Sequence, residues 1–249
     1  MKRILILLGI LASIAAAEVV FAQTAEGVIT YEVKVNMHRR LAAGQEGMKA
    51  MIPEFRTTKQ QLFYNANESF YKPLIEDEDE EISGGSGGMR FRMRQQNEEL
   101  YINPATSALV SKREFMGKDY LIEDTLKISP WKLGDQTKEI LGYACKQAYY
   151  TDESQPDRIL EITAWYTDQL RAMLGPDRYG SLPGTILAVD TNNGERVIVA
   201  RKVELRPLKK SEMKIPSTGQ KMTQQEFRKM ADEQMKHMGG GNGRMIIRN

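Results

Sequence analysis

The chain has 249 residues, with 35 lysines and arginines against 33 aspartates and glutamates, and a formal net charge of +2. This near balance argues against a dedicated nucleic-acid-binding protein, which would carry a basic excess. The single cysteine, Cys145, excludes an internal disulfide, and two histidines are too few for a three-histidine zinc site. The length predicts a single domain with tails.

The N-terminus predicts an export signal, residues 1–22. Met1-Lys2-Arg3 gives a charged start, an apolar block follows at 4–17, and Val20-Phe21-Ala22 offers a small-residue cleavage site. An uncleaved N-terminal anchor is the alternative. Cleavage after Ala22 would leave no transmembrane segment, and Cys145 lies too far away to carry an N-terminal lipid. We therefore predict a periplasmic or secreted protein that is not a lipoprotein.

The next part of the chain alternates in the manner of an antiparallel strand with one wet face. Between residues 28 and 37, Ile29, Tyr31 and Val33 share one side while polar residues share the other. Asn192-Asn193-Gly194 predicts a hairpin turn because Asn and Gly tolerate positive φ. Further strand-like runs are 62–65, 69–72, 89–94, 99–102, 108–115, 118–124, 140–150, 158–166, 185–190 and 195–205. We predict a mainly β fold: a large antiparallel sheet, curved or half-barrel, with a few helices.

Two segments depart from the strand pattern. Residues 76–88 combine six consecutive acidic residues with a Ser/Gly-only run, which predicts a mobile surface loop without the ligand spacing of a calcium site. Thr223 and Glu226 form a capping box, and the apolar stripe that follows predicts a helix ending at Gly239. The predicted organisation is thus one β-rich domain over 23–238 and a flexible tail over 239–249.

The C-terminal helix is rich in methionine. Met230, Met235, His237 and Met238 could bind Cu(I) through thioether sulfur and one imidazole nitrogen. The same methionines are also explained by the helix's apolar stripe, or by contact with an apolar ligand. Copper binding is therefore kept as an alternative.

No set of residues predicts a reaction. Neither His38 nor His237 lies in a catalytic signature, and Cys145 has no CxxC partner and fits a buried small residue. Carboxylate pairs are plentiful, but the sequence does not show which of them face each other. We name no catalytic residue and predict no cofactor.

The stretch from Ala164 to Asp190 is the most distinctive. Tyr166 and Thr185 are separated by 18 residues, a long connection for a compact β domain, so it should be structured or functional. It is either a structural corner or the rim of an apolar cavity. For the second interpretation the candidate ligand-binding residues are Trp165, Tyr166, Leu182, Pro183 and Gly184.

Within this stretch, Ser181-Leu182-Pro183-Gly184-Thr185-Ile186 matches four of six positions of a GLPGLI hexapeptide. Trp165-Tyr166-Thr167, the segment 27–32 and Lys138 through Cys145 extend the likeness. The chain resembles the GLPGLI family, a Porphyromonas-type exported domain of unknown function. The resemblance implies an exported, β-rich protein with no established reaction and, by fold analogy, a LolA-like half-barrel.

These patterns lead to an expectation about function. We expect a non-enzymatic binding or accessory protein of the cell envelope that holds an apolar or lipid ligand, or a segment of an outer-membrane protein, and no nucleic acid. A Met-rich copper protein and an uncharacterised enzyme are the alternatives.

Overall fold

The computed structural model describes residues 26–41, 44, 46–75, 98–155 and 158–239, and the side chains of 235–239 are not among those described. The predicted signal peptide, the acidic and glycine-rich loop 76–88, the strand expected at 89–94 and residues 240–249 lie outside these ranges. Within them, no helix is both long and apolar enough to cross a membrane.

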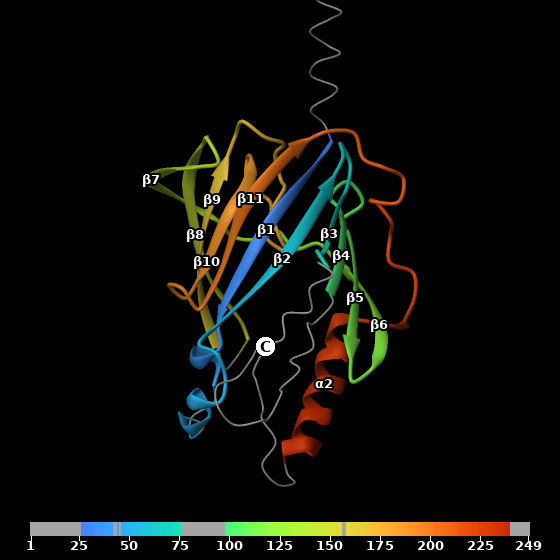
Figure 1. Cartoon of the computed structure of the whole chain (residues 1–249). Coiled ribbons are helices and arrows are strands. Elements are labelled where there is room, and N and C mark those ends of the chain that lie inside the picture. The colour runs from blue at the N-terminus through green and yellow to red at the C-terminus, as the bar shows by residue number, and fades with distance from the viewer. Residues whose placement is uncertain (1–25, 42–43, 45, 76–97, 156–157, 240–249) are drawn as a thin grey trace, which may run out of the picture.

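The described residues form one sheet of 12 strands (Figure 1), in the order β12-β6-β5-β4-β3-β2-β1-β11-β10-β9-β8-β7. All neighbours pair antiparallel except β12 and β6, which are parallel. The strands are β1 (Gly27–Asn36), β2 (Phe55–Tyr64), β3 (Ser69–Pro73), β4 (Glu98–Asn103), β5 (Ala108–Phe115), β6 (Lys118–Thr125), β7 (Lys132–Ile140), β8 (Tyr143–Gln155), β9 (Arg158–Thr167), β10 (Thr185–Thr191), β11 (Arg196–Leu205) and β12 (Gln220–Met222).

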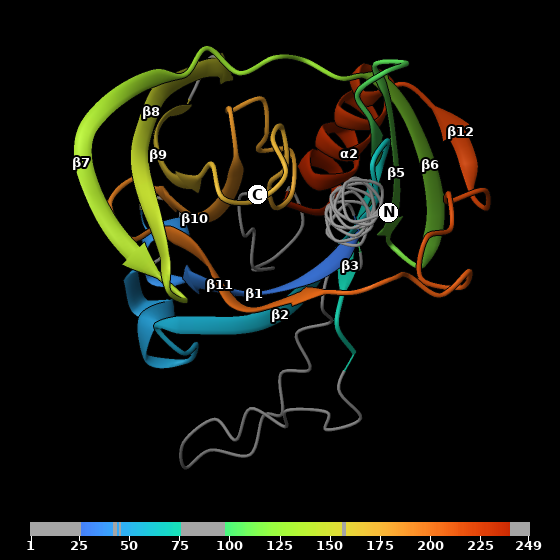
Figure 2. The ribbon, with the colours of Figure 1, turned by 90° about the horizontal axis from the view of Figure 1, so that it is seen from above.

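The sheet bends into a bowl. Seen from above in Figure 2, β7–β9 face β3–β6 across the interior, and the connection 126–131 spans the gap between the two sheet edges. The edge strands β12 and β7 do not pair in the described part of the chain, so the sheet stays open. The predicted large, curved, mainly β fold is confirmed, with one parallel strand added.

The core lies on the concave side of the bowl. Ile29 and Tyr31 on β1 point into it and are fully buried, as the alternation of this strand predicts. The Tyr31 hydroxyl donates a hydrogen bond of 2.7 Å to the Ile186 carbonyl, which ties β1 to the start of β10. On the convex side Val28 packs in a smaller cluster, which Leu208 and Met213 cover from the segment after β11.

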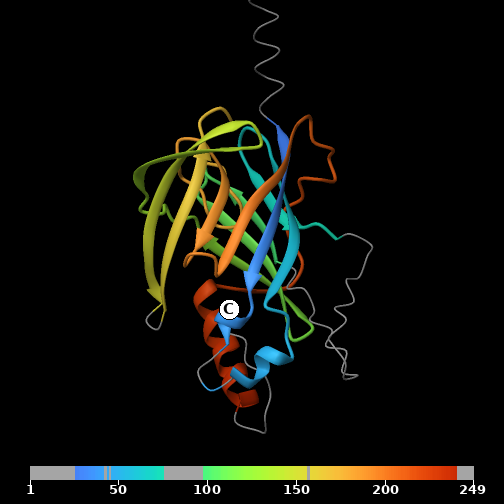
Figure 3. The same ribbon diagram turned by 60° about the vertical axis from the view of Figure 1, so that its left-hand side comes forward.

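The helical elements lie together at one end of the bowl. The 3-10 helices η1 (His38–Arg40) and η2 (Glu46–Ala50) lie at the same end as α2 (Gln224–Gly239), as Figure 3 shows. On α2, Phe227 and Ala231 pack against Tyr120 and Ile122 of β6. The capping box forms as predicted: the amide N of Thr223 donates to Glu226 Oε2 at 2.7 Å, and that of Glu226 donates to Thr223 Oγ1 at 3.2 Å. We call the end of the bowl that carries η1, η2 and α2 the basal end.

Candidate functional site

Residues 168–184, which connect β9 to β10, enter the bowl as a plug, drawn in gold inside the sheet in Figure 2. Its two limbs are tied together, because the amide N of Met173 donates to the Leu182 carbonyl at 2.9 Å. Leu174 and Leu182 are only 3% and 2% exposed in the main core. The plug is therefore part of the hydrophobic core and fills the space that an apolar ligand would need.

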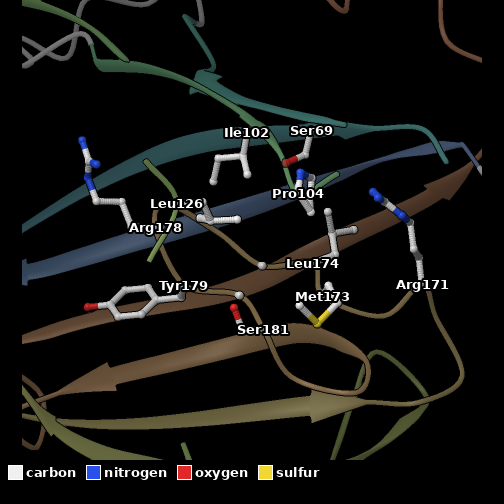
Figure 4. Close-up of a pocket in the computed structure, with 12 residues that line it drawn as sticks. Ser69, Ile102, Pro104, Leu126, Arg171, Met173, Leu174, Arg178, Tyr179 and Ser181 are labelled. Carbon is white, nitrogen blue, oxygen red and sulfur yellow. The ribbon is translucent and has the colours of Figure 1, made fainter. Parts of the chain in front are cut away.

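A small cavity remains beside the plug (Figure 4), with a volume of about 20 Å³. Ser69, Ile102 and Leu126 line one side of it, and Met173 and Tyr179 line the plug side. This volume holds about one water molecule and is far too small for an acyl chain. Among the described residues, the plug thus covers the part of the concave face where an apolar ligand was expected.

At its tip the plug meets a group of charged side chains at the basal end, which we call the basal cluster. Its members come from η1, five strands, the plug tip and the β10–β11 hairpin. They are Arg40, Tyr71, Glu98, Arg113, Arg158, Asp177, Arg178, Tyr179, Glu195 and Arg196. The charged side chains in it are between 8% and 32% exposed, so the cluster is sheltered but reachable from solvent.

Ion pairs join the plug tip to both walls of the bowl. Arg196 Nη2 lies 2.9 Å from Asp177 Oδ2, which connects β11 to the tip. On the opposite wall, Glu98 Oε1 lies 2.8 Å from Arg113 Nη2 and 3.1 Å from Arg178 Nη2. Two carboxylates thus hold three guanidinium groups in fixed positions around the tip.

The electrostatics of the tip keep Asp177 ionised. Burial alone would raise the pKa of its carboxyl, but Arg196 and Arg178 outweigh burial, and the pKa is lowered. Burial would likewise lower the pKa of Arg196, but Asp177 and neighbouring tyrosines raise it above its ordinary value. A carboxylate held this firmly in its charged form is suited to positioning and hydrogen bonding, and poorly suited to proton transfer at neutral pH.

The other half of the cluster is less well balanced. Glu195 pairs with Arg158, and Asn192 Nδ2 donates to its second oxygen at 2.8 Å. Arg40 Nε lies 3.6 Å from Glu195 Oε1. Burial lowers the pKa of Arg40, and Arg158 and Arg196 lower it further, while Glu195 offsets this only in part. Among the described residues, two guanidinium groups, those of Arg40 and Arg158, therefore approach the one carboxylate of Glu195.

The five predicted ligand-binding residues lie away from the basal cluster. Tyr166 and Leu182 are buried in the core, Pro183 is exposed, and Trp165 is half-buried with Lys138 Nζ 4.2 Å from its ring centroid. A Cβ added to Gly184 would lie 2.1 Å from the Thr167 carbonyl oxygen. This placement supports the structural-corner interpretation, and ligand binding by these residues stays a prediction.

The predicted copper ligands are described only in part. Met230 packs against the cluster of Tyr120, Ile122 and Phe227, while the side chains of Met235, His237 and Met238 lie outside the described set. Among the described residues, no group of three or more His, Cys, Asp or Glu could hold a metal ion. Copper binding through the methionines stays a prediction.

The comparisons with known proteins place the chain in a family. Residues 89–230 match the family described as N-glycanase peptide, N-terminal domain (PNGase F-II). The match covers more than half of the chain, which therefore belongs to this family. No curated protein matches the chain.

Two solved structures show the same fold. They are PNGF-II in the P21 and C2 space groups, each 17% identical, with TM-scores of 0.55 and 0.54. Both cover 84% of this chain, which spans 34% and 33% of theirs, about a third of their length.

The family match overturns two expectations: membership of the GLPGLI family, and the interpretation as a non-enzymatic binding protein for an apolar ligand. Three of the four shared positions have a local steric explanation. Leu182 and Ile186 are core residues, and Gly184 is required by its contact with the Thr167 carbonyl. Any β corner of this shape needs similar residues, so a short hexapeptide identifies the corner and says little about the family.

Proposed function

We propose that the chain functions in the removal of N-linked glycans from glycoproteins, with the basal cluster contacting the glycan. The family supports the reaction class, since its members are N-terminal domains of N-glycanases. Most of the cluster's charged residues lie within the matched range of 89–230, Arg40 being the exception. The observation that carries the proposal is the sheltered arrangement of guanidinium, carboxylate and phenol groups at the plug tip.

This arrangement suits a sugar chemically. A sugar hydroxyl both donates and accepts hydrogen bonds, so it needs fixed donors and acceptors side by side. Glu98 between Arg113 and Arg178 provides such a set, and Asp177 with Arg196 provides a second one nearby. Hydrogen bonds to ionised partners are about twice as strong as neutral ones. The cluster would therefore favour a polyhydroxylated ligand over an apolar one.

The role assigned to the cluster is to hold the glycan while the protein–glycan link is broken. Its carboxylates are neutralised by arginines, and Asp177 stays ionised because its pKa is lowered. Asp177 is therefore poorly suited to carry a proton at neutral pH. The side chains therefore support positioning of the substrate.

The test uses one N-glycopeptide and the same peptide without its glycan. Binding of each to the full chain is measured by titration calorimetry, and glycan release is followed by mass spectrometry as conversion of the glycosylated Asn to Asp. We expect binding of the glycopeptide only. Arg178→Gln should weaken it about tenfold by removing charge-assisted hydrogen bonds.

A matched control is Arg201→Gln. Arg201 makes one ion pair of 2.5 Å with Glu32 and is 57% exposed, away from the basal cluster. This variant should bind the glycopeptide as the wild type does. Equal binding of the two peptides, or neither binding nor release with either, would overturn the proposed function.

A further inference from the structure

Counted over the described residues that form it, the basal cluster carries more positive than negative charge. Its five arginines face three carboxylates, on Glu98, Asp177 and Glu195. The imbalance is concentrated around Arg40. The Arg40 guanidinium lies near both Arg158 and Arg196, and Glu195 offsets their effect on Arg40 in part, while Arg196 is itself paired with Asp177. A group of like charges held together in a sheltered site is stabilised when an anion binds between them.

A second, independent observation is a set of hydrogen-bond donors without partners. Within the described residues, the Tyr71 hydroxyl, Arg40 Nε and Arg113 Nε are buried and make no hydrogen bond. The Tyr71 side chain is 7% exposed, and its electrostatic neighbours are Asp177, Arg196 and Glu98 of the cluster. Burial raises the pKa of this phenol, so it remains a donor at every physiological pH. Native proteins pair almost all such groups, so each one calls for a water, an ion or a ligand.

The chemistry of these donors, which lack a hydrogen-bond partner, defines the ligand that they would bind. Guanidinium N–H groups and a phenol hydroxyl in its donor role require an acceptor with several oxygens. A carboxylate or a sulfate presents such oxygens in a geometry that the guanidinium fork matches. A neutral sugar hydroxyl would satisfy the hydrogen bonds but would leave the charge unbalanced.

We propose that the basal cluster selects N-glycans that carry an anionic substituent, either the carboxylate of an acidic sugar or a sulfate ester. This inference rests on the proposed function and specifies its substrate class. Arg40 is the residue to test first, because its ion pair with Glu195 is long, at 3.6 Å. Removing it should disturb the ion pairs at the plug tip least.

The experiment compares three forms of one N-glycopeptide: sialylated, enzymatically desialylated and sulfated. Affinities for the full chain are measured by calorimetry at low and at high salt. We expect at least one anionic form to bind about tenfold more tightly than the desialylated form, an advantage that high salt reduces. The form that gains affinity identifies the anionic group.

The Arg40→Gln variant should lose this advantage, so that its affinities for the anionic and desialylated forms become similar. Arg40→Lys keeps the positive charge but loses the planar guanidinium, so it should retain part of the affinity advantage for the anionic form. Arg201→Gln should retain all of that advantage. Circular dichroism and thermal unfolding show that each variant is folded. Equal affinity of the wild type for all three forms would overturn the inference and leave the proposed function intact, whereas absence of binding to any form would overturn both.

Discussion

The plug has two parts that differ in chemistry although they belong to one connection. The stem, residues 168–174 and 181–184, places Leu174 and Leu182 in the main core, where a backbone hydrogen bond from Met173 to Leu182 joins its limbs. The tip, residues 175–180, carries Asp177 and Arg178 into the basal cluster. A stem held by packing can position a tip that carries charge. Stability should therefore depend mainly on the stem, and ligand binding on the tip.

The largest loss of stability is expected for a substitution in the stem. In Gly184→Ala the new methyl group would lie 2.1 Å from the Thr167 carbonyl oxygen, so the backbone of the corner must move. We expect a loss of about 4 kcal/mol in the free energy of unfolding, or failure to fold. Urea unfolding measures it. Gly47→Ala is the control, because nothing lies within 4 Å of its added Cβ. Equal stability of the two variants would contradict the described corner.

Leu182→Ala tests whether the stem is part of the core. The side chain is 2% exposed, and its truncation should cost about 3 kcal/mol through lost burial and the cavity that remains. Leu133→Ala removes the same atoms from a side chain that is 64% exposed, and it should be close to neutral. A small loss for Leu182→Ala would mean that the plug is not packed in solution.

The substitution Asp177→Asn tests the contribution of the plug tip to stability. The substitution leaves Arg196 without its carboxylate partner, and we expect a loss of about 2 kcal/mol at pH 7. The folded-state pKa of Asp177 is lowered, so its contribution is complete above the unfolded value of about 3.9 and is lost as the pH falls through the folded pKa. The difference between wild type and variant, measured by urea unfolding, should therefore shrink below about pH 4. A stability difference that grows below about pH 4 would contradict the ion pair between Asp177 and Arg196.

The smallest loss of stability is expected for the ion pair at the start of the stem. Lys146 Nζ lies 2.7 Å from Asp168 Oδ2, but both side chains are more than half exposed. Solvent screens such a pair, so Lys146→Gln should leave the urea midpoint unchanged within error. A loss as large as that of Asp177→Asn would remove the distinction between a solvated ion pair and a sheltered one.

Local sequence patterns were sufficient to predict most of the sheet. The alternation from Ile29 to Val33 gives β1 its buried face, and Asn192-Asn193-Gly194 forms the hairpin between β10 and β11. The parallel pairing of β12 was not predicted, because Gln220–Met222 is too short to carry a strand pattern. A strand of three residues forms because it pairs with the edge of a neighbouring strand, here β6.

The candidate site was not predicted, for a physical reason. Glu98 and Arg113 lie opposite each other on β4 and β5, but Asp177 and Arg196 come from the plug and β11. The path of the plug, which the sequence did not predict, brings these two pairs together. The Gly175-Pro176 turn indicated a structured connection but not its direction, so a plug was not distinguished from a cavity rim. Charged residues inside a Gly/Pro-rich connection of 18 residues were the one available signal.

The central claim is that a packed stem holds a charged tip that contacts an N-glycan. The most direct test is an NMR titration of the protein with an N-glycopeptide, observing the arginine Nε–H signals and the leucine methyl signals together. We predict shifts for Arg178 and Arg196 at the tip and none for the methyl groups of Leu174 and Leu182. Shifts of those methyl groups with unchanged arginine signals would contradict the claim.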